Sequence, residues 1–190
     1  MNYSDATQRL TAFRGQIAAI RSEMRKVQAA IEPQEIRDYV FAAERGGLRL
    51  SDLFGDKRDL LVIHNMGRAC VYCTLWADGY NGVYDHLASR AAFVVCSPDP
   101  PSTQKEFAAS RGWKFRMISH EGTSFAEDMG YRANGGGWLP GISVFRREGQ
   151  RILRVSDAAC GPGDDFNALW HLFDLLPGGA GDWRPKFNYA

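Results

Sequence analysis

The pattern of apolar positions near the start of the chain predicts one long helix. Large apolar residues recur at alternating spacings of three and four, which places them along one face of a helix. They are Leu10, Phe13, Ile17, Ile20, Met24, Val27 and Ile31. Pro33 ends the pattern because proline cannot continue helical hydrogen bonding. We expect residues 1–33 to form an amphipathic helix that packs on its own domain or on a second subunit as a homodimer. A basic helix for a membrane or nucleic acid is the weaker alternative, because few seam residues are aromatic.

Two apolar runs further along the chain predict neighbouring parallel strands. Residues 60–64 and 91–96 are short apolar runs, which are typical of strands covered on both faces. A helical stretch that ends near Leu87 lies between them. This order indicates a βαβ unit, whose two strands are parallel.

The rest of the pattern predicts an α/β domain. Residues 142–145 and 152–155 form a predicted hairpin, and a closing helix follows the turn at 161–164. A hairpin-like turn is also expected at Glu44-Arg45-Gly46-Gly47. From residue 60 the expected order is therefore β-α-β-α-β-β-α.

Cys70 and Cys73 form the strongest chemical signal in the chain. A Cys-x-x-Cys pair at the start of a helix closes to a disulfide without large backbone movement. The helix N-terminus favours the thiolate of Cys70, which makes it the expected nucleophile, and Cys73 the resolving thiol. Half of a zinc site is the alternative, but Cys96 and Cys160 stand apart and the histidines are scattered. Two cysteines that only pack in the core are a further alternative, and we expect no metal and no cofactor.

Pro140 is the second candidate for the site. It precedes the predicted hairpin, where a cis proline would face the start of the cysteine helix and leave the backbone of Leu139 free to pair with a substrate. A trans proline in a loop is the alternative. Trp76 and Trp138 flank the two motifs, and we expect them to floor a substrate groove or to pack in the core.

Three further side chains have alternative roles. His64 lies shortly before Cys70, where it either lowers the pKa of that thiol or is a hydrogen-bonded structural histidine, the interpretation that we favour. Cys96 ends an apolar strand and is expected in the core. Cys160 precedes a glycine-rich turn, where a third redox thiol is the minor alternative.

The placement of these motifs resembles the thioredoxin superfamily. The segment 48–55 and the inserted region 97–139 are similar to its peroxiredoxin-like branch. Closer still, the segments 73–79, 97–101, 138–141 and 161–166 resemble a bacterial family of thioredoxin-like proteins labelled dithiol–disulfide oxidoreductases. The resemblance implies a thioredoxin-like fold over residues 34–190: a central mixed sheet flanked by helices, with an added N-terminal helix and an insertion before the cis-proline.

The resemblance also implies an activity. Members of this superfamily exchange thiols and disulfides with a protein or small-molecule substrate. Thioredoxins usually have proline between the two cysteines, whereas this chain has Val71 and Tyr72. The intervening pair tunes the redox potential, and a shift of about 30 mV corresponds to roughly 1.4 kcal/mol.

Other functions remain as alternatives. Peroxide reduction is one, although the usual proline-threonine lead-in to the cysteine is missing before Cys70. Binding of copper(I) by the two thiols and His120 is another. A thioredoxin-fold binding module without catalysis is the third.

The composition of the chain indicates where the protein is located and which partners it does not bind. The 23 basic and 22 acidic side chains nearly balance, so no bulk charge draws the chain to nucleic acid or to an anionic membrane. No stretch approaches the roughly 20 apolar residues that a membrane helix needs. The first residues lack the pattern of a signal peptide, so we expect a cytoplasmic protein.

Overall fold

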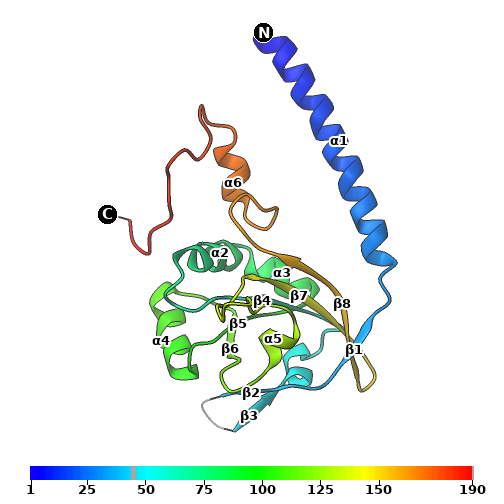
Figure 1. The fold of residues 1–190 in the computed structure, drawn as a ribbon, viewed down its shortest axis with the longest axis vertical. Helices are drawn as coiled ribbons and strands as arrows, with labels where there is room; N and C mark the ends of the chain where they lie inside the picture. Colours follow the sequence, from blue (N-terminus) through cyan, green and yellow to red (C-terminus); the bar gives the residue numbers. More distant parts are fainter. Residues whose placement is uncertain (44–45, 190) are drawn as a thin grey trace.

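A mixed β-sheet organises the chain in the computed structural model, which describes residues 1–43 and 46–189 (Figure 1). Over these residues the sheet has eight strands in the order β1-β8-β7-β4-β5-β6-β2-β3. The strands are β1 (Gln34–Ile36), β2 (Val40–Ala42), β3 (Gly47–Arg49), β4 (Asp59–His64), β5 (Ala92–Ser97), β6 (Arg116–Ser119), β7 (Gly141–Glu148) and β8 (Arg151–Ala159). The helices are α1 (Tyr3–Ala29), the short 3-10 helix η1 (Leu50–Phe54), α2 (Val71–Gly82), α3 (Tyr84–Arg90), α4 (Pro101–Arg111), α5 (Phe125–Asp128) and α6 (Ala168–Phe173).

The centre of the sheet confirms the predicted βαβ unit. β4 pairs in parallel with β5, with Leu60 opposite Ala92, and β5 continues in parallel with β6. β4 also pairs antiparallel with β7, and β7 and β8 form the predicted hairpin. The cysteine helix α2 therefore follows the central strand of the sheet directly.

Apolar side chains fill both faces of the sheet, which explains the unbroken apolar run in β4. Leu60 and Val62 are buried with Phe54 and Phe125 on the face covered by η1 and α5. Ile63 points the other way, into the cluster beneath α2, α3, α4 and α6. Alternate residues of a strand point to opposite faces, so a strand with packing on both faces is apolar at successive positions, although Leu61 is only partly buried.

A second hairpin lies at the far edge of the sheet. β2 and β3 pair antiparallel, with Val40 opposite Arg49. Of the turn expected at Glu44-Arg45-Gly46-Gly47, Glu44 and Arg45 lie outside the described residues.

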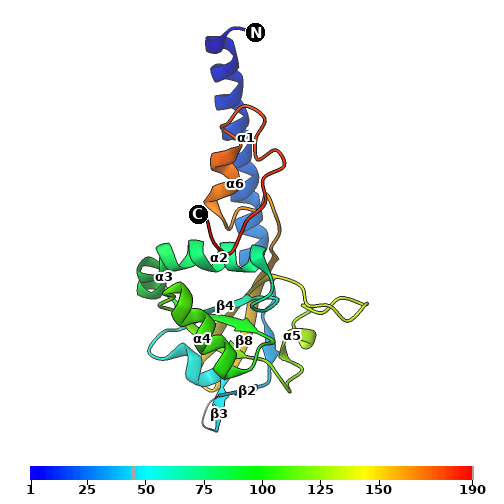
Figure 2. The same cartoon turned by 90° about the vertical axis from the view of Figure 1, so that its left-hand side faces the viewer.

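Helix α1 forms as predicted, but it does not pack on its own domain. No residue of α1 is buried, and the helix stands out from the body (Figures 1 and 2). Ala30 ends it, and the chain enters β1 at the sheet edge instead of crossing the sheet. The expectation of packing within one domain is therefore wrong, and the second subunit remains as the predicted partner. None of the helices in the described part of the chain is long and apolar enough to cross a membrane.

Candidate active site

Cys70 lies at the N-cap of α2, as the spacing predicts. Its backbone is extended, with φ −88° and ψ 103°, and its Sγ accepts a hydrogen bond from the backbone N–H of Cys73 at 3.2 Å. The sulfur takes the place that a serine or aspartate oxygen commonly fills at a helix start. Neither Cys70 nor Cys73 is in a disulfide, so the structure describes the dithiol form.

The two thiols have opposite pKa shifts. A hydrogen bond from the Cys73 side chain is the largest cause that lowers the pKa of Cys70 to about 6, and the backbone N–H groups of Cys73 and Tyr72 act in the same direction, while burial opposes them. The same bond to Cys70, followed by burial, raises the pKa of Cys73, whereas the backbone N–H of Met66, 3.4 Å from its Sγ, lowers it. Cys70 is half-buried and Cys73 is buried. This arrangement gives one reactive thiolate and one protected thiol.

A carboxylate on the neighbouring strand end holds the loop that precedes Cys70. The Asp99 carboxylate accepts the backbone N–H of Arg68 at 2.8 Å and the hydroxyl of Ser97 at 3.1 Å. Gly67 has a φ of +102°, and a Cβ on it would lie 3.1 Å from Asp99. Glycine is therefore required here both by backbone conformation and by the close carboxylate. The contact of Asp99 with the cysteine loop had no local signal in the sequence.

The structure corrects the expectation of a cis proline. No cis peptide bond occurs among the described residues, so the bond from Leu139 to Pro140 is trans. The backbone around it is paired within the protein: the N–H of Leu139 donates to the carbonyl of Tyr131 at 2.9 Å, and the N–H of Cys160 donates to that of Pro140 at 3.1 Å. A trans bond is the lower-energy isomer, and here it keeps the chain extended into β7. The N–H of Leu139 is consequently not free for a substrate.

A largely apolar cavity of about 360 Å³ opens beside Cys73. The loop after β4, the start of α2 and the loop after β8 form its walls, and its lining includes Met66, Tyr72, Cys73, Trp76, Pro140, Cys160 and Pro162. It brings together three of the predicted site residues: Cys73, Trp76 and Pro140. Cys70 precedes this wall on the same loop.

Trp76 is both a core residue and a wall of the cavity. It is 6% exposed, and its Nε1–H donates to the Asp164 carboxylate, 3.0 Å from Oδ2. The same carboxylate accepts the backbone N–H groups of Gly161 and Phe166, each at 2.9 Å. Asp164 therefore fixes the loop after β8 against the cysteine helix.

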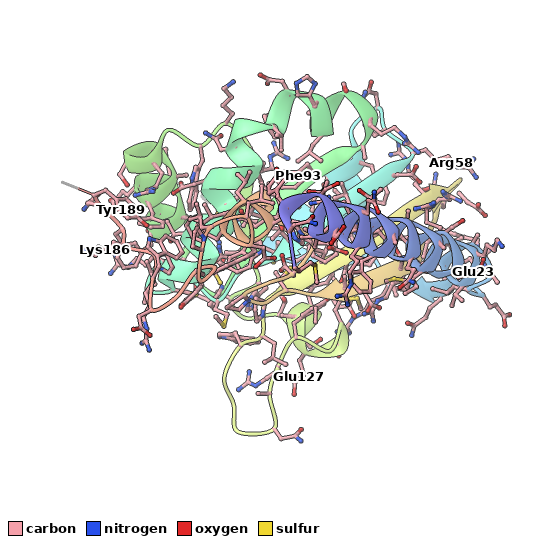
Figure 3. The ribbon with its side chains drawn as sticks, turned by 90° about the horizontal axis from the view of Figure 1, so that it is seen from above. Glu23, Arg58, Phe93, Glu127, Lys186 and Tyr189 are labelled. Carbon is pink, nitrogen blue, oxygen red and sulfur yellow. The ribbon has the colours of Figure 1, made fainter. Side chains whose placement is uncertain are left out.

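Trp138 and Leu139 lie apart from this cavity. The loop that carries them projects from the body on the side of α5, where Figure 3 labels Glu127 (Figures 2 and 3). The Trp138 ring lies edge-on to His120, with centroids 4.4 Å apart, and the Arg132 guanidinium lies 4.7 Å from its centroid. The Leu139 side chain is 42% exposed.

The other two cysteines differ in their surroundings. Cys96 is fully buried in β5, as predicted, and burial raises its pKa. Cys160 lines the cavity together with Cys73. Burial and the charge of Asp164 raise the pKa of Cys160 to about 12, so it is a thiol at neutral pH. Its nearness to Cys73 could not be read from the sequence, because the two are brought together only by the pairing of β4, β7 and β8.

His64 has the structural role that the sequence favoured. It is 3% exposed, its Nε2 lies 2.9 Å from the Ser143 hydroxyl, and its ring stacks on Tyr131 with centroids 3.8 Å apart. Burial is the largest cause that lowers its pKa, followed by the charges of His120 and Arg154. His64 is not among the groups that shift Cys70.

The described residues do not assemble the proposed copper site. His120 packs on Trp138, and in residues 1–43 and 46–189 no three His, Cys, Asp or Glu side chains gather in a way that holds a metal ion.

Comparison with known proteins identifies a family. Residues 5–189 match the model of a family described as bacterial protein of unknown function (DUF899). A search of curated proteins found no match.

Solved structures show the same fold in peroxiredoxins. Peroxidoxin BcpB from Mycobacterium tuberculosis is 19% identical with a TM-score of 0.57, over 72% of this chain and 88% of that one. AhpC from Enterococcus faecalis is 18% identical with a TM-score of 0.57, over 75% and 89%. Reduced Prx3 from Vibrio vulnificus in complex with H₂O₂ is 13% identical with a TM-score of 0.55, over 70% and 87%. These likenesses confirm the predicted thioredoxin-like α/β fold, which these peroxiredoxins share.

Proposed function

The chain belongs to the bacterial DUF899 family, and we propose that it is a thiol–disulfide oxidoreductase that works through Cys70 and Cys73. The observation that carries this proposal is the hydrogen-bonded pair at the start of α2, in which the pKa of Cys70 is lowered to about 6 and that of Cys73 is raised. At neutral pH such a pair holds one proton and one negative charge. That is the state a dithiol needs to attack a disulfide.

The reaction has two exchange steps. The Cys70 thiolate attacks one sulfur of a substrate disulfide, so that a Cys70–substrate disulfide forms and the other substrate sulfur leaves as a thiolate. Cys73 then loses its proton to solvent or to the departing sulfur and attacks Cys70, which releases the second substrate thiolate. The dithiol is oxidised by two electrons and the substrate is reduced by two.

The raised pKa of Cys73 does not block the second step. Its largest cause is the bond to Cys70, which favours a protonated Cys73 while Cys70 is a thiolate. Once Cys70 is in a mixed disulfide, that cause is gone. The backbone N–H of Met66 at 3.4 Å then supports the Cys73 thiolate as it forms.

The cavity beside Cys73 supports a substrate with an apolar group next to its disulfide. Trp76 and Pro140 are the walls that we assign to substrate binding, with Tyr72 at the helix start. Leu139 precedes Pro140 and its side chain is exposed, which supports assigning it to contact with a protein substrate outside the cavity. Trp138 lies outside the cavity, and only a substrate large enough to reach the projecting loop would contact it. A cytoplasmic location, where thiols are kept reduced, suits this cycle.

A trapping experiment tests the proposal. Cys73→Ser removes the resolving thiol, so incubation with oxidised glutathione should leave glutathione attached to Cys70 in a stable mixed disulfide. Cys160→Ser, which changes another cysteine that lines the same cavity, is the matched control and should not accumulate the adduct. Absence of the Cys70 adduct in Cys73→Ser contradicts the proposed order of attack.

Peroxide reduction is the second candidate, because the fold is similar to that of peroxiredoxins. In that reaction the Cys70 thiolate attacks one peroxide oxygen, an alcohol or water leaves, and Cys73 condenses with the sulfenic acid to give a disulfide and water. Among the described groups, the causes that lower the pKa of Cys70 are hydrogen bonds from Cys73 and Tyr72 and include no cationic side chain. Rapid stoichiometric loss of hydrogen peroxide on mixing with the reduced protein would place this candidate first.

A further inference from the structure

Helix α1 presents an apolar seam that no other described segment of its own chain covers. The six seam residues within α1, from Leu10 to Val27, are 47–68% exposed, whereas Ile31 lies beyond the helix and lines a hollow of its own chain. Their 3-4-3-4 spacing keeps them in one line along the helix. An uncovered apolar stripe of this length is unusual for a monomeric protein and marks a contact surface.

On the face that carries α2, helices cover only part of the sheet. α3 packs on β5 and α4 on β6, whereas β4, β7 and β8 leave two adjoining hollows of about 360 and 580 Å³. The hollows share Leu61, Val144 and Ser156 on the three strands and Gln28 at the base of α1. We call this surface the trough. Mixed sheets of α/β proteins are ordinarily covered by helices on both faces, so the trough lacks one helix of the layer.

The chain's own α1 does not fill the trough. α1 borders it at Gln28 and then runs away from the body as one continuous helix (Figure 1). The seam residues from Leu10 to Met24 therefore do not contact the sheet of their own chain. A second copy supplies the same helix without bending it.

The exposed area of the seam favours a second copy in the trough. Outside the seam α1 carries Arg9, Arg14, Arg21, Arg25 and Lys26. The charged residues that line the trough are of both signs, namely Asp59, Arg90, Arg146 and Asp157, and Asp157 is already paired with Arg154. Within one chain Arg21 pairs with Asp165 at 2.5 Å, so this contact of the chain's own α1 with the border of the trough must be kept or exchanged when a second copy docks. If each of the six seam side chains in α1 buries on the order of 100 Å², two reciprocal dockings remove roughly 1,200 Å² from the seams, at the lower end of the range of stable interfaces.

We propose that the protein is a symmetric dimer in which α1 of each copy lies in the trough of the other, with its apolar seam against β4, β7 and β8. The contact is isologous, so one interface type closes the assembly. Ile63 lines both the trough and the cavity beside Cys73, so the docked helix lies behind the candidate active site.

Sedimentation velocity of the reduced full chain at tens of micromolar tests the dimer. The expected result is a species of twice the chain mass. Ile20→Glu in the seam and Phe166→Glu at the trough should each weaken dimerisation at least tenfold, since both side chains are exposed in one chain, at 61% and 40%. Ala19→Glu adds the same charge to another face of α1 and should leave the dimer intact.

The outcomes separate this proposal from its competitors. A monomeric wild-type chain overturns it. A dimer that is lost in Ile20→Glu but kept in Phe166→Glu also overturns it, because it indicates that two α1 helices pair with each other. Circular dichroism of each variant identifies any that have failed to fold.

Cross-linking provides a readout that does not rely on destabilising changes. A photoreactive residue at Met24 in unlabelled chains, mixed with ¹⁵N-labelled chains of the same variant, distinguishes contacts within a copy from contacts between copies. The proposal expects mixed-isotope links from position 24 to β7, β8 or the segment around Phe166. Links within single chains only, or between two α1 segments only, contradict it.

Discussion

The backbone N–H of Arg68 donates a hydrogen bond to the carboxylate of Asp99 over 2.8 Å. Cys70 lies two residues after Arg68. Asp99 follows β5, which is the parallel neighbour of β4 in the sheet. The end of one strand therefore fixes the loop that delivers the reactive thiol at the end of the other. Asp99 is a positioning residue, since it does not contact the sulfur in the described hydrogen bonds.

Asp99→Ala should slow disulfide exchange by roughly threefold to tenfold. The exposed N–H of Arg68 loses its protein acceptor, and the loss of such a hydrogen bond costs about 0.5–1.5 kcal/mol net, which allows the loop to move. Asp99→Asn keeps an acceptor oxygen and should recover most of the rate. Stopped-flow reaction of the reduced protein with an aromatic disulfide measures both variants. Equal rates for Ala, Asn and wild type would show that the contact does not position Cys70.

The reactivity of Cys70 should follow a midpoint near pH 6. The thiolate is the nucleophile, so alkylation slows about tenfold for each pH unit below the midpoint and levels off above it. Cys73→Ala removes the thiol that donates to Cys70 and should move the midpoint upward, toward the ordinary cysteine value of about 8.5. The rate of iodoacetamide labelling at Cys70, followed by peptide mass spectrometry, gives the midpoint.

Cys160→Ser is the control for this titration. Cys160 lines the cavity, but it is not among the groups that shift the pKa of Cys70. The midpoint should stay near 6 in this variant. An ordinary thiol midpoint in the wild-type protein would instead remove the physical basis for Cys70 as the nucleophile.

Gly141→Ala should destabilise the protein by about 1–3 kcal/mol, the usual cost of overfilling a packed interior. A Cβ at this position would collide with the Tyr131 ring and would lie 2.7 Å from the backbone oxygen of Ala158. Gly135→Ala, in the projecting loop, meets nothing within 4 Å and should change little. Urea unfolding of the two variants provides the comparison, and similar midpoints for both would contradict the packing described for Tyr131.

Asp164→Ala should lower the free energy of unfolding by about 1–3 kcal/mol, because the buried Trp76 Nε1–H loses its acceptor. Its neighbour Asp165, whose side chain is 51% exposed, is the control. Asp165→Ala should cost within about 0.5 kcal/mol, as is usual for an exposed ion pair. Urea denaturation followed by tryptophan fluorescence measures both. Equal losses would mean that Asp164 does not hold the loop after β8 to α2.

The central sheet and the cysteine helix could be predicted from local pattern. The apolar runs at 60–64 and 91–96 indicated buried parallel strands, and the structure confirms them as β4 and β5. Strands that pack on both faces need apolar residues at successive positions, so the sequence pattern alone indicates where such strands lie. The N-cap position of Cys70 was also predictable, because only a short loop separates the end of β4 from the start of α2.

Features that depend on contacts between distant segments could not be predicted. The trans bond before Pro140 follows from backbone pairing of its neighbours with Tyr131 and Cys160. The presence of Cys160 in the cavity depends on the register of β7 and β8. The direction in which α1 leaves the body depends on where β1 joins the sheet edge. None of these has a local sequence signal.

A redox titration tests the central claim most directly. The protein is equilibrated across glutathione buffers, free thiols are trapped with a mass-tagged alkylator, and the tags are located by peptide mass spectrometry. The account predicts that Cys70 and Cys73 lose their tags together as one two-electron couple, while Cys96, fully buried in β5, keeps its thiol. The midpoint reduction potential of this couple then indicates the direction of electron flow: a reductant lies at roughly −270 mV and an oxidant at about −120 mV. If Cys70 and Cys73 never form a disulfide with each other at any potential, the protein is not the dithiol oxidoreductase proposed here.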